Sequence, residues 1–386
     1  MSKKLLVIFA MATLLAGIAA WYITKSRVPE TEIQATPLFP DLINRVNDIV
    51  RIEIKARDQA TALSKQGEGW VIENKSRYPA SFEKIRGMVI AVAGLEVLEG
   101  KTKNKELYPR LGVEDIETEG AASHQVLFFA EQEQPLVSLI VGKERATPSG
   151  RYVPALYVRK AGEEQALLVK GQLMVPEEPV DWAARELLNI EAKRIREISI
   201  EPPGQSPLRI HRKSPDAGDF TLDNSPEGSK LKSQTVLNSL ASALESLQFD
   251  DIVARSEFTP PPNPTITTLR AFDGLVTKVT VAQANDKPHA SFEFAYDAKA
   301  AAQQPKSEQA DPSVKAEKRP SVEEEVAKLN EKARDWVYVL PTYKANLLTK
   351  TLNDLTALKE EPKEKKEKEE PLQRKDTPSR PKAPER

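Results

Sequence analysis

The chain opens with an apolar segment that has the length of a membrane-spanning helix. No charged residue occurs from Leu5 to Ile23, and Lys3 and Lys4 precede this stretch while Lys25 follows it. Nineteen residues at about 1.5 Å rise each give a helix of about 28 Å, close to the hydrocarbon thickness of a bilayer. We therefore expect residues 1–25 to form a transmembrane anchor that contacts the lipid bilayer through Leu5 to Ile23.

A cleaved signal peptide is the main alternative to an anchor. The apolar core of a signal peptide usually has about 7 to 15 residues and ends in small residues. Gly17 and Ala19 offer a weak cleavage site, but Trp21 and Tyr22 continue the apolar run and suit an interfacial aromatic belt. The pattern favours an uncleaved anchor, whereas cleavage would release a soluble periplasmic protein.

The charges that flank the segment bear on its orientation. Lys25 and Arg27 balance Lys3 and Lys4, so that only the free α-amino group favours a cytoplasmic N-terminus. Long C-terminal domains cross the membrane largely regardless of their own charge. We expect a single-pass protein of the bacterial inner membrane, with its N-terminus in the cytoplasm and its C-terminal bulk in the periplasm.

After a polar connector at 26–47, the same order of strand and helix patterns occurs twice. We place the first module at 48–193 and the second at 194–358. Each begins with a period-two strand, continues with a second short strand and an amphipathic helix, and ends with further strands. The first strands place apolar residues at the same spacing, Ile49, Ile52 and Ile54 in one copy and Ile195, Ile198 and Ile200 in the other.

The two predicted helices have the same spacing of apolar positions. Ser81 precedes the first helix as a candidate N-cap, and Gly94 marks its end. The apolar faces consist of Ile85, Met88, Val89, Val92 and Leu95 in the first copy and Leu237, Leu240, Ala241, Leu244 and Leu247 in the second. Agreement in order, helix spacing and length predicts an internal duplication.

Later strand patterns complete each module. They cover 125–130, 136–141, 152–158 and 166–169 in the first copy, and 265–271, 275–281, 291–296 and 336–340 in the second. Their β-branched content and period-two spacing suit antiparallel sheets. We predict an α+β fold in which an N-terminal transmembrane helix precedes two tandem duplicated modules, each an antiparallel sheet with a helix packed on one face. The aromatic residues of the strands are expected in the core.

Two segments have the composition of disordered chain. A charged insertion at about 298–334 carries few large apolar residues, although Ser321 to Ala333 has the pattern of a short charged helix. A terminal helix is expected at 343–358. The tail at 359–386 alternates lysine and glutamate and contains five prolines, which predicts disorder.

Composition excludes several classes of function. The 386 residues include 56 basic and 57 acidic side chains, a formal net charge of −1, so that no global attraction to nucleic acid is expected. The chain has no cysteine. This absence excludes disulfides, thiolate nucleophiles, cysteine-ligated metals and the lipid-acceptor cysteine of a bacterial lipoprotein.

The sequence lacks the common catalytic and nucleotide-binding motifs, including the nucleophile elbow, the P-loop and the zinc-binding His-Glu-x-x-His. The three histidines, His124, His211 and His289, are far apart and are expected on the surface. The acidic group Glu177, Glu178 and Asp181 is interleaved with prolines and indicates a solvated turn. We predict no catalytic residue, no cofactor and no metal ligand, and hence a protein that is not an enzyme.

Several short motifs, taken in order, resemble the bacterial domain-of-unknown-function family four-three-four-zero. They are Gly69-Trp70, Tyr78-Pro79-Ala80, Tyr108 with Leu111-Gly112-Val113, Val141-Gly142, Gly150-Arg151-Tyr152-Val153, and Asp181-Trp182 followed by Leu187-Leu188. The resemblance covers about 50–200. It implies a membrane-anchored envelope protein, and because some members are encoded beside ABC-type transport components resembling those of gliding motility, it implies such proteins as partners.

Two hypotheses of function follow from these patterns. The first is a non-enzymatic, membrane-anchored envelope protein that binds or scaffolds a partner, accessory to an ABC-type transport complex. The alternative is an enzyme or binding protein that acts on envelope polymers through a cleft between the two modules.

Overall fold

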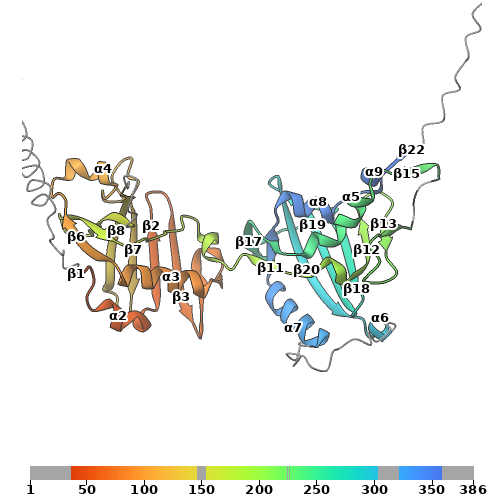
Figure 1. Cartoon of the computed structure of the whole chain (residues 1–386), viewed down its shortest axis with the longest axis horizontal. Helices are drawn as coiled ribbons and strands as arrows, with labels where there is room; N and C mark the ends of the chain where they lie inside the picture. The colour runs from red at the N-terminus through yellow and green to blue at the C-terminus, as the bar shows by residue number, and fades with distance from the viewer. Residues whose placement is uncertain (1–35, 146–153, 224, 226, 303–320, 359–386) are drawn as a thin grey trace, which may run out of the picture. The chain divides into compact units, whose positions relative to one another are not determined.

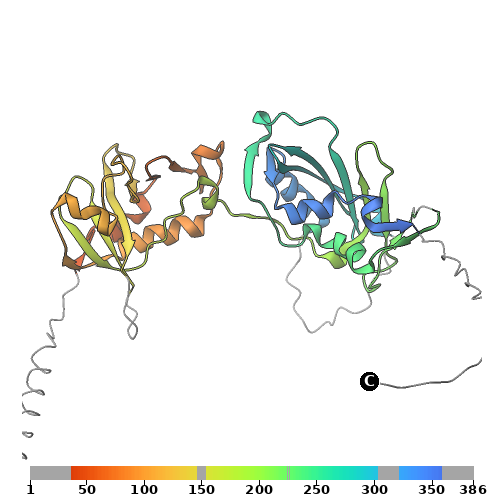
Figure 2. The same ribbon diagram turned by 90° about the horizontal axis from the view of Figure 1, so that it is seen from above.

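The computed structural model of the chain describes residues 36–145, 154–223, 225, 227–302 and 321–358 (Figures 1 and 2). The chain divides into two compact units. Unit 1 comprises the described residues up to Leu187 together with Gln248–Phe258 and Trp336–Val339, and unit 2 comprises Leu188–Leu247, Thr259–Asp335 and the described residues from Leu340 onward. The predicted anchor, the predicted tail and the motif residues 150–153 lie outside the described residues.

A ten-stranded antiparallel sheet forms the body of unit 1, in the order β1-β6-β10-β9-β8-β7-β2-β3-β4-β5. Its strands are β1 (Thr36–Pro37), β2 (Arg51–Lys55), β3 (Ala60–Gln66), β4 (Gly69–Ile72), β5 (Tyr78–Pro79), β6 (Glu96–Gly100), β7 (His124–Phe129), β8 (Pro135–Glu144), β9 (Ala155–Lys160) and β10 (Ala166–Lys170).

The predicted first helix is confirmed as α3 (Phe82–Ala93), which lies across one face of this sheet (Figure 1). Ile85, Met88, Val89 and Val92 are buried, as the spacing predicts. Ser81 has the extended backbone of an N-cap, but its side chain makes no capping hydrogen bond. At the other end, the N–H of Gly94 donates to the carbonyl of Ile90 and closes the helix.

The second sheet has eight strands in the order β14-β13-β12-β18-β19-β20-β21-β17. They are β12 (Ile195–Glu201), β13 (Leu208–His211), β14 (Thr221–Leu222), β17 (Asp251–Ala254), β18 (Thr265–Ala271), β19 (Leu275–Ala284), β20 (Lys287–Tyr296) and β21 (Trp336–Val339). Both sheets therefore confirm a mixed α+β fold with antiparallel strands.

The predicted second helix differs from its expectation in form. It is an α-helix only over α5 (Gln234–Ser239) and continues as the 3-10 helix η6 (Leu240–Leu244). The hydroxyls of Ser239 and Ser242 each donate to a carbonyl three residues earlier, at 2.7 Å. Such side-chain bonds compete with the α-helical backbone pattern and favour the tighter turn.

The predicted terminal helix at 343–358 is broken into three elements, α8 (Thr342–Leu348), α9 (Leu352–Leu355) and β22 (Thr356–Leu358). The hydroxyl of Thr349 donates to the carbonyl of Ala345, and Thr351 forms a capping box with Asp354 that begins a new helix. The sequence pattern does not reveal this break, because the helical spacing of leucines continues across it.

The insertion contains more helix than expected. Ala298–Ala302 form α6, and the Asp297 carboxylate accepts hydrogen bonds from the backbone N–H groups of Lys299 and Ala300 at its start. The charged helix predicted at Ser321 to Ala333 is confirmed as α7 (Val322–Ala333), with a capping box between Ser321 and Glu324. Residues 303–320 lie outside the described part of the chain.

Short elements connect the larger ones. They are α2 (Leu42–Arg45), α4 (Tyr108–Leu111), β11 (Glu186–Leu188) with β16 (Leu247–Gln248), β15 (Ser229–Leu231), which pairs with β22, and the 3-10 helices η1 (Val46–Asp48), η2 (Glu73–Lys75), η3 (Lys105–Leu107), η4 (Pro179–Trp182), η5 (Ala192–Arg194) and η7 (Arg255–Glu257).

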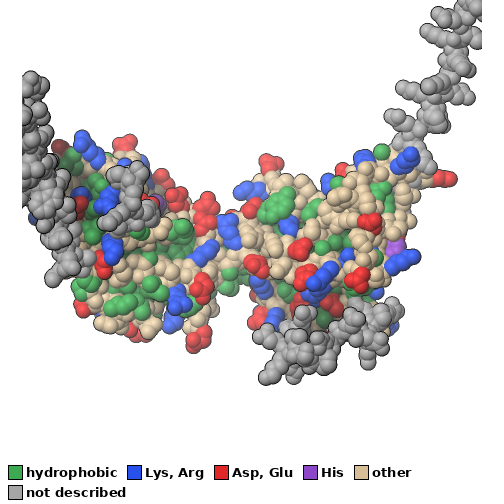
Figure 3. Space-filling model, viewed as in Figure 1, with side chains coloured by type: hydrophobic (Ala, Val, Ile, Leu, Met, Phe, Trp, Pro, Cys, Tyr) green, Lys and Arg blue, Asp and Glu red, His purple; other side chains and the backbone are tan. Residues whose placement is uncertain are grey.

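Two properties of the described chain bear on its surroundings. None of its helices is both long enough and apolar enough to cross a membrane. Basic and acidic side chains are interspersed on the face shown in Figure 3, in keeping with a net charge of −1.

Candidate functional site

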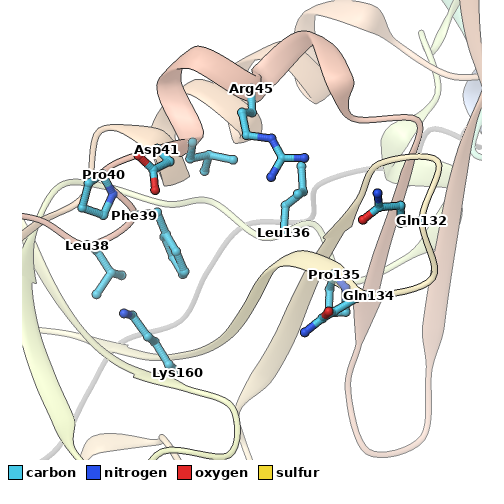
Figure 4. Close-up of a pocket in the computed structure, with 11 residues that line it drawn as sticks. Leu38, Phe39, Pro40, Asp41, Arg45, Gln132, Gln134, Pro135, Leu136 and Lys160 are labelled. Carbon is cyan, nitrogen blue, oxygen red and sulfur yellow. The ribbon is translucent and has the colours of Figure 1, made fainter.

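A cavity of about 340 Å³ in unit 1 is the candidate binding site (Figure 4). It lies between the segment that leads into α2, the turn that joins β7 to β8, and the end of β9. The lining residues are Leu38, Phe39, Pro40, Asp41, Leu42, Arg45, Gln132, Gln134, Pro135, Leu136 and Lys160.

Two buried leucines hold one wall of the cavity in place. Leu38 and Leu42 are almost completely buried. The N–H of Leu38 donates to the carbonyl of Leu95 at 2.8 Å, and the N–H of Leu42 donates to the carbonyl of Phe39 at 3.2 Å. Because both ends of this short segment are fixed, Phe39, Pro40 and Asp41 between them are held at the cavity with little freedom.

The polar groups of the cavity are mostly hydrogen-bond donors. Arg45 and Lys160 supply positive charge, and Gln132 and Gln134 supply amides, against the single carboxylate of Asp41. The two cations come from different walls (Figure 4).

Each of the two cations forms only a partly exposed ion pair within the protein, so that it stays able to bind a ligand. The Nε atom of Arg45 lies 3.1 Å from a carboxylate oxygen of the exposed Asp48, and the ammonium of Lys160 lies 4.0 Å from Glu163. The same ammonium lies 5.5 Å from the ring centre of Phe39. An aromatic face beside cations and amides suits a ligand with hydroxyl or anionic oxygens on a partly apolar frame.

Sequence reasoning did not single out any residue of this cavity. Its walls come from residues about a hundred positions apart. The pairing of β7, β8 and β9 brings the β7–β8 turn near Lys160, and the pairing of β1 with β6 places the segment at residues 38–45. The only local signal is Phe39-Pro40-Asp41, a turn-forming group with an aromatic residue inside the predicted connector.

The structure separates the three histidines. His211 is partly exposed, and its Nδ1 lies 2.5 Å from Asp223, while the Nε2 of His124 lies 3.9 Å from Glu177. The prediction of a surface position is wrong for His289, which is only 8% exposed. It lies near the start of β20, where its Nδ1 bonds the carbonyl of Lys287 at 2.9 Å. Within the described ranges, no group of three potential ligands could hold a metal ion.

The acidic group near Trp182 has the local structure of a turn. Glu177 and Glu178 are exposed ahead of the 3-10 helix η4, and Asp181 forms an ion pair of 2.5 Å with Arg185. The ammonium of Lys84 donates to the carbonyls of Asp181 and Ala183. Burial, helped by the positive charge of Arg185, lowers the pKa of Lys84. These contacts fix the chain and do not form a pair of carboxylates facing one bond.

The motifs around Tyr108 and Gly142 hold α4 against β8. Gly112, which follows α4, has a φ of +69°, and its N–H donates to the carbonyl of Tyr108. The ring of Tyr108 lies 4.7 Å from the guanidinium of Arg159, which is buried in β9. Burial raises the pKa of Tyr108, whose hydroxyl donates to the carbonyl of Glu164. These motif residues therefore have a structural role.

Comparison with known proteins gives a family and no function. No curated protein and no solved structure matches the chain. One protein family, described as "Domain of unknown function (DUF4340)", matches residues 70–271, which is more than half of the 386 residues. This is the family that the motifs of the first unit resemble. The chain therefore belongs to the family of the domain of unknown function DUF4340.

Proposed function

We propose that this protein is a single-pass, membrane-anchored envelope protein whose two modules bind or scaffold a partner, accessory to an ABC-type transport complex. The anchor is supported by the apolar pattern of Leu5 to Ile23 and its basic flanks. The transport partner is supported by the resemblance described above, which implies ABC-type transport components as partners of this family. A non-enzymatic role remains the expectation from the sequence.

The observation that carries the proposal is the order of strands in the two sheets, which supports a duplicated binding body. From β6 to β4 the first sheet has the order β6-β10-β9-β8-β7-β2-β3-β4. The second sheet, read from its opposite end, has the order β17-β21-β20-β19-β18-β12-β13-β14. Each strand of the first copy has a counterpart that occupies the same position in both the sheet and the chain. A shared order over eight strands favours duplication over coincidence.

The register of the strands supports the same correspondence at single residues. Ile52 of β2 lies opposite Leu63 and Phe128, and its counterpart Ile198 of β12 lies opposite Ile210 and Leu269. A short 3-10 helix, η1 or η5, precedes the first strand in each copy. We infer from these matches that one ancestral module gave both halves.

Removal of residues 1–25 tests the anchor. We expect the truncated chain to remain in the cytoplasm as soluble protein, because the segment supplies both export and attachment. Replacing residues 1–25 with a cleavable signal peptide should give a soluble periplasmic protein, measured by fractionation and carbonate washing. N-terminal sequencing of the native protein checks for cleavage, and a mature chain that begins after Ala19 would contradict the anchor.

Co-purification tests the partner. The full chain, expressed at its endogenous level and solubilised in a mild detergent, should recover an ATPase and a permease of an ABC-type transporter. The chain carrying a heterologous single-span anchor of equal length is the control, and it should recover the same subunits if the modules carry the interaction. Recovery of the protein alone would count against the proposal.

The cavity of Figure 4 favours a second candidate function, the binding of an envelope polymer. Its aromatic ring, two amides and two cations are suited to sugars that carry carboxylates. We expect the double variant Arg45→Met, Lys160→Met to weaken binding of soluble peptidoglycan fragments about tenfold or more, measured by calorimetry.

Two exposed cations outside the cavity provide the matched control for this measurement. The double variant Arg57→Met, Lys65→Met removes the same charge from β3 and the turn before it. It should leave the affinity unchanged. Equal losses in the two double variants would mean a general effect of charge and would remove the cavity from consideration.

A further inference from the structure

The chain returns across each sheet alongside the helix. In the first sheet it leaves β10, and the carbonyl of Trp182 accepts a hydrogen bond of 2.7 Å from the N–H of Ser81, immediately before α3. In the second sheet it leaves β21, and the carbonyl of Leu355 accepts a hydrogen bond of 2.7 Å from the N–H of Lys232, two residues before α5. The two return segments are therefore equivalent in where they start and where they end.

In the second sheet a helix fills the space beside η6. The return segment forms α8, in which Ala345 and Leu348 are buried. The ammonium of Lys344 donates to the carbonyl oxygens of Ser242 and Glu245, at 2.8 and 2.6 Å, at the C-terminal end of η6. Under this cover Ala243 of η6 is completely buried.

In the first sheet the corresponding space holds a groove. The return segment forms only the short η4, and a cavity of about 610 Å³ lies between it and α3, lined by Gly87, Met88, Ala91, Leu173, Met174 and Trp182 among others. Gly87 is exposed and Ala91, the counterpart of Ala243, is only half-buried. Met174 is 78% exposed. One face of α3 therefore lacks the helix that covers its counterpart.

We propose that this groove binds an amphipathic helix of a partner protein in the position that α8 takes in the second sheet. The proposal rests on the duplicated binding body proposed above and names the chemistry of its partner. The lining is mostly apolar, with Lys84, Gln172 and Asp181 as its polar members. It includes Met174, which is exposed and whose unbranched side chain can adapt to a packed helix.

The groove also defines what the partner helix must carry. Small and aliphatic residues at a spacing of three, like Ala345 and Leu348, fit the space above Ala91. Glu177 and Glu178 are exposed between two lining residues and favour a basic residue on the helix. Trp182, which also lines the groove, is fully buried, and its indole N–H has no acceptor among the described residues.

A peptide from the chain itself provides the probe. A fluorescent peptide of residues 341–358 should bind the purified full-length protein saturably in detergent solution, measured by fluorescence polarisation. Gly87→Trp should weaken this binding about tenfold or more, because the indole fills the groove. The matched control is Gly218→Trp. A Cβ at either glycine meets no atom within 4 Å, and neither glycine has a positive φ.

Each outcome of this experiment decides the proposal. Ala91→Trp repeats the test if circular dichroism shows that Gly87→Trp disturbs the fold. The proposal is overturned by equal binding of a scrambled peptide, by equal losses in the Gly87 and Gly218 variants, or by absence of saturation. Saturable binding of a dansyl fatty acid, without binding of the peptide, would overturn the proposal in favour of a small amphiphile as the occupant of the groove. Conversion of a larger assembly to a monomer by Gly87→Trp would overturn it in favour of a second copy of this chain.

The peptide assay requires only this chain. Its failure therefore leaves the result of the co-purification experiment unchanged, and the two proposals are tested separately.

Discussion

We expect Gly142→Ala to destabilise unit 1 by about 3 kcal/mol, one of the largest effects of any single methyl group in this chain. A Cβ at Gly142 would lie 2.7 Å from the carbonyl oxygen of Gly112 and 2.7 Å from Cγ1 of Val113, and closer still to the carbonyl oxygen of Leu111. Real Cβ atoms do not approach backbone oxygens so closely, so that the end of α4 must move away from β8.

Moving the end of α4 away from β8 would break several contacts. Gly112 is held by the hydrogen bond from its N–H to Tyr108, and the ammonium of Lys143 donates to the carbonyl of Pro109 at 3.0 Å. Val113 is completely buried in a cluster with Tyr108 and Ile140. Displacement of α4 would open this cluster, which makes a loss larger than ordinary overpacking the expected result.

Denaturant unfolding measures the effect, with tryptophan fluorescence as the signal because Trp70 and Trp182 both lie in unit 1. Gly87→Ala is the matched control. Its Cβ meets no atom within 4 Å, and it lies inside α3, where alanine is favoured over glycine by up to about 1 kcal/mol. The two substitutions should therefore have opposite signs. A loss below about 1 kcal/mol for Gly142→Ala would contradict the close approach of α4 and β8.

The sequence pattern predicts the regular part of this fold well. Strand β2 is identified by the period-two spacing of Ile52 and Ile54, and helix α3 by the helical spacing of Ile85 to Val92. Both could be predicted because each element buries one face, and the buried positions repeat with the period of the element. The pattern fails where short-range side-chain bonds decide the backbone. Ser239, Ser242 and Thr351 change the course of helices whose leucine spacing is uninterrupted.

The candidate site could not be predicted in the same way. Gln132 and Lys160 meet because β7, β8 and β9 pair, and Phe39 reaches them because β1 pairs with β6. Each residue alone has the pattern of an exposed turn or strand end. Buried charges are equally hidden, since arginine and lysine are ordinarily expected on the surface. Arg159 and Lys344 are buried, and each donates to two backbone carbonyls that lie far from it in the sequence or at the end of a turn.

Arg159→Met is the second substitution with a large expected effect, a loss of about 3 kcal/mol from unit 1. Arg159 is 3% exposed. Its guanidinium donates to the carbonyl of Val113 at 2.9 Å, to the carbonyl of Glu163 at 3.0 Å and to a carboxylate oxygen of Asp115 at 2.5 Å. Methionine fills the volume of the stem but leaves the buried carbonyl of Val113 without its donor.

A lysine at this position separates charge from geometry. Arg159→Lys keeps the positive charge, yet a single ammonium cannot reach three acceptors that a planar guanidinium reaches together, so that it should recover less than half of the loss. Arg57→Met is the control, because this exposed side chain lies 4.0 Å from Asp58 and its removal should change the free energy of unfolding by less than about 0.5 kcal/mol. If Arg159→Lys recovered the full free energy of unfolding, the positive charge alone would hold α4. That result would contradict the role of the planar guanidinium. Because Gly142 and Arg159 both contact the loop at Val113, the double variant should lose less than the sum of the two single losses.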